Sequence, residues 1–296
     1  MTPAIKSVPA GSLSVAYEEY GPADGPAVLL LHGFPYDPRA FDRVAPALAE
    51  SGYRVIVPYL RGYGPTRFLD AGTVRSGEQA AIANDLRALI EALALPSVLL
   101  AGFDWGGRAA CIVAALWPER VRGLLAIGGY LIQDPDTMLA PLPPALEQRL
   151  WHQYFLASPR GRAALERNRA NLCRHFCESW SPGIALDEAA FTASLVSFDN
   201  PDFVEIVVHS YAHRIGMTPG DPALAPIQAR LAGKPPIGVP TIVLRGGSAP
   251  LGGNAAKFIN LIDDRSVAGA GHNPAGETPQ AVVAALLDLD RYCSNR

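Results

Sequence analysis

Short, mainly apolar runs alternate with amphipathic stretches along most of the chain. Runs of this kind, bounded by polar residues, glycine or proline, predict buried strands. They lie at 27–31, 54–58, 97–101, 121–129, 241–245 and 265–268, after an alternating strand at 12–20. Apolar residues spaced every three or four positions predict helices. These lie at 39–50, at 76–95, from 107 onward, at 254–261 and at 279–292. Strands that alternate with helices are typical of a doubly wound, mostly parallel α/β sheet.

The pattern changes between residue 131 and about residue 233. This stretch has helical spacing and is rich in aromatic residues and arginine, and it is interrupted by S-P-G at 181–183 and N-P at 200–201. We therefore predict a helical cap at 131–233, inserted into an α/β core that comprises 1–130 and 234–296. A chain of 296 residues is long enough to bury a large core and to hold such an insertion.

The charge balance narrows the classes of partner. A formal net charge of −3 provides no broad basic surface, so nothing supports binding to nucleic acid or to an anionic membrane. No apolar segment reaches the roughly 18 residues that a membrane span needs, and residues 1–6 lack the core of a signal peptide. We therefore expect a cytoplasmic protein. Its oligomeric state is not visible in the sequence.

The cysteines form no C-x-x-C pair and are interpreted as reduced thiols. They are Cys111, Cys173, Cys177 and Cys293. The pair at 173 and 177 lies in a helical stretch without a second pair of ligands nearby, which disfavours a zinc site. No metal and no organic cofactor is expected.

The segment 102–106, G-F-D-W-G, has the spacing of a nucleophile elbow with aspartate in place of the usual serine. A predicted strand precedes it and a predicted helix follows, so Asp104 is expected on a tight turn with its side chain in a cleft. A carboxylate that displaces a group from sp3 carbon leaves an ester that water can hydrolyse, whereas serine would leave a stable ether. Asp104 thus points to alkyl transfer from an epoxide or a halide. The alternative is that Asp104 only caps the helix, a role that does not require the flanking glycines.

Four motifs follow one another along the chain: H-G-F-P at 32–35, R-G-Y-G at 61–64, the elbow at 102–106 and G-H at 271–272. With these motifs nearly the whole chain resembles the α/β-hydrolase family. Within that family it is most similar to the epoxide hydrolase branch, which shares a cap and an aspartate nucleophile with haloalkane and fluoroacetate-type dehalogenases. The resemblance implies the α/β-hydrolase fold, with a helical cap inserted into a mostly parallel sheet.

His272 follows small residues after a predicted strand, and it comes late in the chain after the nucleophile, which is the order expected of a catalytic histidine. We expect it to activate water against the alkyl ester on Asp104. The resemblance gives His32 a structural role beside the oxyanion hole. The backbone N–H groups of Phe34 and Trp105 are the expected oxyanion donors.

Opening an epoxide releases an alkoxide, which needs an acidic O–H nearby, whereas a departing halide needs only N–H donors. The resemblance implies two cap tyrosines for this task. Tyr211 matches the second, while Trp151 stands where the first is expected and Tyr154 lies one turn further. Tyr211 and Tyr154 are therefore the candidate catalytic tyrosines, although buried cap tyrosines also serve as core. Trp151, His152 and Phe155 are the expected substrate-binding residues, and a small aromatic or cyclic apolar epoxide is the expected substrate.

Two groups of dehalogenases are the alternatives. Haloalkane dehalogenases commonly carry asparagine where this chain has Phe34, so only Trp105 of their halide clamp is present. Fluoroacetate-type dehalogenases carry paired basic residues after the nucleophile to hold a carboxylate, and only Arg108 matches one of these positions. His152 matches a halide-pocket histidine of that group, which keeps a haloacid substrate open.

The chain departs from all these families at the acid that orients the catalytic histidine. The turn after 241–245 reads G-G-S-A, with Ala249 in place of the expected aspartate, and the earlier position near 128–129 has no carboxylate. Asp134 and Asp136 are the only substitutes by location. Loss of the acid should slow ester hydrolysis more than alkylation. The sequence therefore predicts a hydrolase that opens an epoxide to a diol slowly or with another carboxylate, and it leaves open dehalogenation, a non-hydrolytic tailoring reaction or ligand binding.

Overall fold

The structure, a computed structural model, describes residues 3–137, 139–246 and 255–295. These residues form a nine-stranded sheet with the strand order β1-β2-β4-β3-β6-β7-β8-β9, and β5 pairs with β2. The strands are β1 (Ile5–Ala10), β2 (Leu13–Tyr20), β3 (Ala27–Leu31), β4 (Arg54–Pro58), β5 (Arg67–Phe68), β6 (Val98–Gly102), β7 (Val121–Ile127), β8 (Thr241–Gly246) and β9 (Leu261–Val267). The strands predicted at 27–31 and 54–58 are present with these bounds.

Strand β2 runs opposite to each of its neighbours in the sheet. β2 is antiparallel to β1, β4 and β5, whereas the neighbours from β4 to β9 run parallel. Parallel strands that are buried on both faces are nearly continuous apolar runs, which is why β3, β6 and β7 can be predicted from the sequence. Their carboxyl ends meet at one edge of the sheet, where folds of this kind place their ligands.

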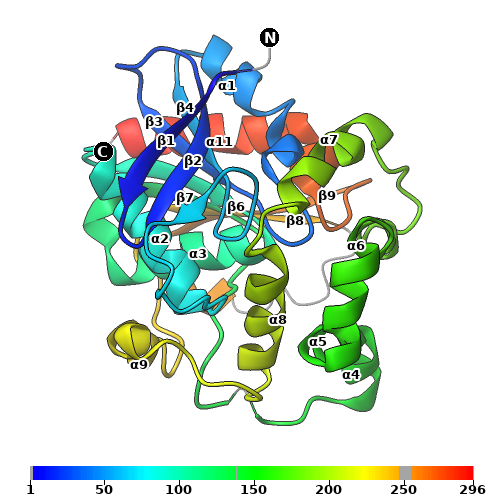
Figure 1. Cartoon of the computed structure of the whole chain (residues 1–296). Helices are drawn as coiled ribbons and strands as arrows, with labels where there is room; N and C mark the ends of the chain where they lie inside the picture. The colour runs from blue at the N-terminus through cyan, green and yellow to red at the C-terminus, as the bar shows by residue number, and fades with distance from the viewer. Residues whose placement is uncertain (1–2, 138, 247–254, 296) are drawn as a thin grey trace.

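Helices cover both faces of the sheet (Figure 1). They are η1 (Pro38–Phe41), α1 (Ala45–Glu50), α2 (Gln79–Ala92), α3 (Asp104–Leu116), η2 (Pro118–Arg120), α10 (Pro274–Glu277) and α11 (Pro279–Ser294). α1 and α11 share one apolar cluster with Leu99, and α2 and α3 share another with Leu100. These two neighbours on β6 point into different clusters because side chains alternate across a sheet. The end of β6 is therefore held from both sides.

A helical region is inserted between β7 and β8. Its helices are α4 (Pro144–Arg149), α5 (Trp151–Ala157), α6 (Pro159–Trp180), α7 (Glu188–Phe198) and α8 (Phe203–Arg214), followed by η3 (Pro222–Leu224) and α9 (Ala225–Ala229). In Figure 1 the green to yellow-green helices α4 to α8 lie together beside the sheet. α5 packs on α6 and α8, and α9 packs on α2. The predicted doubly wound, mostly parallel sheet with an inserted helical cap is confirmed. No helix among the described residues is both long and apolar enough to span a membrane.

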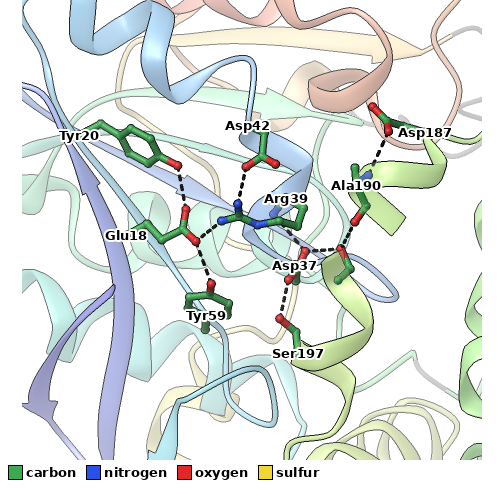
Figure 2. Close-up of polar contacts among 10 residues, drawn as sticks. Glu18, Tyr20, Asp37, Arg39, Asp42, Tyr59, Asp187, Ala190 and Ser197 are labelled. Carbon is green, nitrogen blue, oxygen red and sulfur yellow. Dashed lines mark hydrogen bonds and ion pairs between the residues drawn. The ribbon is translucent and has the colours of Figure 1, made fainter. Parts of the chain in front are cut away.

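A chain of buried polar contacts joins the cap to the sheet (Figure 2). Asp37, just before η1, accepts hydrogen bonds from the hydroxyls of Ser194 and Ser197 on α7. Arg39 in η1 forms an ion pair with Glu18 on β2. One side of the cap is thus fixed to the segment that follows β3.

Two helix predictions are wrong in detail. The helix expected at 39–50 is two elements, η1 and α1, because Pro46 in the first turn of α1 begins a new helix. The helix expected at 254–261 is replaced by the short 3-10 helix η4 (Ala255–Lys257) and the start of β9, and residue 254 lies outside the described residues. β9 is a largely exposed edge strand, so most of it lacks the apolar run that marks a buried strand. The exposed edge strand β1 is missed for the same reason.

Candidate active site

Asp104 lies where β6 ends and α3 begins, on a strained turn. Its φ is 50°, in the left-handed region that residues other than glycine rarely adopt. The flanking glycines make the turn possible. A Cβ on Gly106 would lie 2.3 Å from the Leu31 carbonyl oxygen, and one on Gly102 would lie 2.7 Å from the Gly106 backbone. Phe103 holds the N-cap position of α3. Capping therefore does not explain Asp104, whereas a strained turn that projects a nucleophile does.

The two carboxylate oxygens of Asp104 have different neighbours. Oδ1 accepts a hydrogen bond of 2.9 Å from the backbone N–H of Phe34. Gly33 permits this approach, since a Cβ there would lie 2.4 Å from the Cβ of Asp104. Oδ2 lies 3.9 Å from Nε2 of His272. One oxygen thus faces an expected oxyanion donor, and the other faces the expected base.

His32 anchors the loop that carries Phe34. Its Nε2 accepts a hydrogen bond of 3.2 Å from the backbone N–H of Leu60, and its Nδ1 lies 3.2 Å from the carbonyl oxygen of Gly33. Complete burial lowers the pKa of His32 to about 4, so the ring is neutral near pH 7. These contacts give His32 a structural role.

His272 lies in the loop between β9 and α10. Its ring centroid is 4.9 Å from that of Trp180 and 6.0 Å from that of Tyr36. Its Nε2 is buried and has no hydrogen-bond partner among the described residues. Burial lowers the pKa of His272, and the negative charges of Asp104 and Glu277 oppose this effect. The ring is therefore mostly neutral near pH 7, as a general base requires.

The cap helices α5 and α8 place His152 and Tyr211 close enough to Asp104 for its charge to act on the pKa of both side chains. The rings of His152 and Tyr211 are 5.6 Å apart and nearly perpendicular, and His152 is 5.0 Å from Trp180. Burial, and then the positive charge of Arg214, lowers the pKa of His152 to about 4. Burial and the charge of Asp104 raise the pKa of Tyr211. Near pH 7 the imidazole is thus neutral and the tyrosine keeps its O–H.

Besides Nε2 of His272, two further ring nitrogens in this region are buried without a hydrogen-bond partner in the part of the chain that the structure describes. They are Nε1 of Trp105 and Nδ1 of His152. The Trp105 ring lies 6.1 Å from Tyr211 and stacks at 5.7 Å on Phe34. Buried polar groups are normally paired, so open ring nitrogens near Asp104 are suited to a polar atom of a bound molecule.

Comparison with known proteins agrees with this geometry. Residues 26–276 match the α/β hydrolase fold family. The chain belongs to this family. Its similarities also place this α/β hydrolase in the epoxide hydrolase and haloalkane dehalogenase-like branch.

A solved structure of a candidate epoxide hydrolase from Klebsiella pneumoniae is 44% identical, with a TM-score of 0.94 and a match that covers 97% of each chain. Mouse bifunctional epoxide hydrolase 2 is 28% identical over 57% of this chain and 29% of its own length. Fluoroacetate dehalogenase from a Burkholderia species is 35% identical over 46% of this chain and 43% of its own length. The match thus spans less than half the length of these two curated relatives. The protein is thus an α/β-hydrolase-fold protein that is similar to epoxide hydrolases and to dehalogenases.

Tyr154, predicted as a catalytic tyrosine, lies at the surface of the cap. Its side chain is 48% exposed, and its hydroxyl donates a hydrogen bond of 2.5 Å to Oε2 of Glu147. α5 buries His152, whereas Tyr154 two positions later lies on its outer side. A helix of seven residues has too few apolar positions for periodicity to fix its orientation. The structure therefore does not support Tyr154 as a proton donor, and His152 occupies the place beside Tyr211.

The two aromatic residues predicted to bind substrate with His152 pack on each other. Trp151 is 44% exposed, and its ring lies 5.5 Å from that of Phe155. Trp151 also contacts His175 and Phe176. Phe176 in turn lies 5.7 Å from Phe34 and 6.0 Å from His152, so Trp151 meets the site through a shared neighbour. A role of Trp151 and Phe155 in substrate binding stays a prediction.

The residue that replaces the triad acid, Ala249, lies outside the described residues. Asp136 is exposed, and Asp134 lines a small cavity whose described lining includes neither the nucleophile nor His272. The charge that acts on His272 besides that of the nucleophile comes from Glu277. The substitutes considered from the sequence are therefore not the carboxylates that the structure places near the histidine.

Three residues near His272 escape prediction from the sequence. Tyr36 stacks on its ring, and Ser181 and Glu277 contact its loop. Tyr36 directly follows the H-G-F-P loop, a signal that could have singled it out. Ser181 and Glu277 carry no such signal, because they become neighbours of His272 only through the fold.

Cys111, Cys173 and Cys177 are buried and form no disulfide. No group of three or more His, Cys, Asp or Glu side chains in the described ranges is placed to hold a metal ion.

Proposed function

We propose that this α/β hydrolase converts an epoxide to a diol through an alkyl ester on Asp104. The observation that carries the proposal is the different surroundings of its two oxygens. Oδ1 accepts from the N–H of Phe34 at 2.9 Å, and Oδ2 faces Nε2 of His272 at 3.9 Å. Similarity to the Klebsiella candidate epoxide hydrolase over nearly the full length supports the same reaction class.

In the first step, Oδ2 of Asp104 attacks a carbon of the oxirane, and the bond from that carbon to the ring oxygen breaks. The leaving oxygen takes the proton of the Tyr211 hydroxyl, which belongs to a side chain that is 1% exposed. The rings of Trp105 and His152 lie 6.1 Å and 5.6 Å from that of Tyr211, where they can hold the substrate. An O–H donor favours an epoxide over a halide, because an alkoxide needs a proton and a halide does not.

In the second step, His272 takes a proton from water, and the resulting hydroxide attacks Cγ of the Asp104 ester. The negative charge develops on Oδ1, which already lies 2.9 Å from the N–H of Phe34. The N–H of Trp105, at the start of α3, is the proposed second donor. Collapse of the intermediate breaks the bond between Cγ and the alkyl oxygen, and the imidazolium protonates the departing alkoxide to give the diol. Asp104 is released as the acid and loses its proton, and the tyrosinate of Tyr211 regains one.

Intact-protein mass spectrometry with a panel of aryl and cyclic epoxides tests this proposal. The wild-type protein should release diol, and His272→Gln should retain a mass increase equal to that of the epoxide, because alkylation does not need the base. Asp104→Asn should give neither diol nor adduct. Diol formation by Asp104→Asn at the wild-type rate contradicts the proposal. So does the absence of an adduct on His272→Gln with an epoxide that the wild-type protein hydrolyses.

A halide that carries a carboxylate is the second candidate substrate, and two arginines favour it. Arg108 is buried and Arg214 is half-buried, and within the described residues neither forms an ion pair. Burial lowers the pKa of Arg108 to about 9, and burial also lowers that of Arg214, while the charge of Asp104 opposes both effects. A substrate carboxylate near Asp104 would balance this positive charge.

Halide release from fluoroacetate and chloroacetate, measured by ion chromatography, decides between the two candidates. If the acid is the substrate, Arg108→Gln and Arg214→Gln should raise KM for chloroacetate and leave turnover of a neutral chloroalkane unchanged. Diol formation from epoxides, together with no halide release from either acid, rejects the second candidate.

A further inference from the structure

We propose that Glu277 and the cap residue Ser181 form a clamp that positions His272 for hydrolysis of the ester on Asp104. The inference rests on the proposed epoxide chemistry. Glu277 contacts the backbone of the histidine loop rather than the reacting atoms, so it is a positioning residue. It supplies a carboxylate that the sequence lacks at the expected position of the acid, Ala249.

The Glu277 carboxylate holds the backbone on both sides of His272. Oε2 accepts a hydrogen bond of 2.5 Å from the N–H of Gly271, and Oε1 accepts one of 3.4 Å from the N–H of Asn273. Oε1 also accepts the hydroxyl proton of Ser181. A carboxylate can accept at both oxygens, whereas a glutamine would place an N–H₂ group against one set of donors. The clamp thus uses both oxygens of Glu277 as acceptors.

Ser181 connects this loop to the cap. It directly follows α6, and its Oγ accepts a hydrogen bond of 3.0 Å from the backbone N–H of His272. Its own O–H donates to Glu277. Gly271 packs so closely on it that a Cβ there would lie 2.5 Å from Oγ of Ser181. The end of α6 is therefore in direct contact with the loop that carries His272.

Among the titratable groups that face His272, Glu277 is the one that still carries a negative charge once Asp104 is esterified. These groups are Asp104 from α3, Tyr36 from the loop before η1, His152 from α5 and Glu277 from α10. Burial lowers the pKa of His152 to about 4 and raises that of Tyr36, so both are neutral near pH 7. Residues 247–254 contain no Asp or Glu. Once Asp104 is esterified, Glu277 is the carboxylate that stabilises the imidazolium.

Titration of His272 by NMR tests the clamp without any substrate. His272→Gln identifies the signal, and Glu277→Gln should lower the His272 pKa by about 0.5 or more. Glu178→Gln is the matched control, because Glu178 lines the same cavity of about 430 Å³ as Glu277 and has no contact with the histidine loop in the described residues. An unchanged His272 pKa in Glu277→Gln, or an equal fall in Glu178→Gln, overturns the proposal.

Single-turnover kinetics with an epoxide that labels Asp104 gives the second measurement. Glu277→Gln and Ser181→Ala should each slow ester hydrolysis about tenfold or more and leave the rate of ester formation unchanged. Ser181→Ala should also keep the His272 pKa, since the charge of Glu277 remains. Equal slowing of both steps overturns the proposal. If circular dichroism shows that Glu277→Gln does not fold, Glu277→Asp and Ser181→Ala are used in its place. If no epoxide labels Asp104 even in His272→Gln, the proposed function is wrong. The NMR titration of His272 still tests the clamp, because it needs no substrate.

Discussion

Tyr211 and Tyr154 are both cap tyrosines, yet only Tyr211 is buried close enough to Asp104 for the charge of Asp104 to raise its pKa. Tyr211→Phe should slow alkylation of Asp104 by roughly 10²-fold or more, because protonation of a leaving oxygen contributes about 10²–10⁴-fold. Tyr154→Phe removes a hydrogen bond to Glu147 at the surface and should leave alkylation unchanged. Quenched-flow mass spectrometry of the Asp104 ester measures both rates. Equal losses in the two variants would refute the assignment of Tyr211.

The pH dependence of ester hydrolysis reports on His272. Burial lowers its pKa below the usual value of about 6.5, so the neutral base persists in mildly acidic solution. Esterification of Asp104 removes a charge that raises this pKa, and the base form is then favoured further. Hydrolysis of the preformed ester should therefore be level near pH 7 and fall only below about pH 6.5. A single-turnover rate that still rises with pH above pH 7 would show that burial does not dominate the pKa of His272.

At the scale of the element, the nucleophile elbow depends on glycine. A Cβ at Gly106 would lie 2.3 Å from the carbonyl oxygen of Leu31, a distance that forces α3 away from β3. Gly106→Ala should lower the free energy of unfolding by about 1–3 kcal/mol or more and disturb the turn at Asp104. Gly238→Ala is the matched control, because no atom lies within 4 Å of a Cβ there. Urea unfolding of both variants checks the difference, and equal midpoints would contradict the packing argument.

Elements differ in how far the sequence determines them. β3 and β4 can be predicted to the residue because burial on both faces leaves a continuous apolar run. The elbow can be predicted because its glycines and Asp104 stand at fixed spacing. The orientation of α5 depends instead on packing against α6 and α8, which no periodicity in seven residues reveals. Glu277 escapes prediction because its partners Gly271 and Ser181 are brought together only by folding, and one of them belongs to the cap.

Across the whole molecule, the contacts in Figure 2 join the sheet to the cap. The hydroxyls of Tyr20 and Tyr59 each donate to Glu18 at 2.8 Å, and Glu18 pairs with Arg39. The neighbouring carboxylate, Asp37, receives the two hydroxyls of α7. The serines of α7 and the clamp at the end of α6 are two separate polar attachments of the cap to the core. Others include the ion pair of Arg75 with Asp202 and the hydrogen bonds from Nδ2 of Asn200 to the carbonyl oxygens of Gly64 and Thr66.

Removal of the α7 attachment should loosen one side of the cap and spare the other. The double variant Ser194→Ala and Ser197→Ala leaves the Asp37 carboxylate, 2% exposed, with one hydrogen bond from the backbone N–H of Arg39 among the described donors. Buried acceptors left without partners cost about 1–3 kcal/mol each, so urea unfolding should show a loss of that order.

Limited proteolysis between α6 and α8 should be faster in the double variant than in the wild-type protein. Ser179→Ala is the control, because the Ser179 hydroxyl donates a hydrogen bond of 3.3 Å to the Phe176 carbonyl within its own helix. The His272 pKa should stay at its wild-type value, since Ser181 and Glu277 are intact. A shift of that pKa in the double variant would mean that the two attachments are coupled, and the position of the catalytic histidine would then depend on the whole cap rather than on the end of α6.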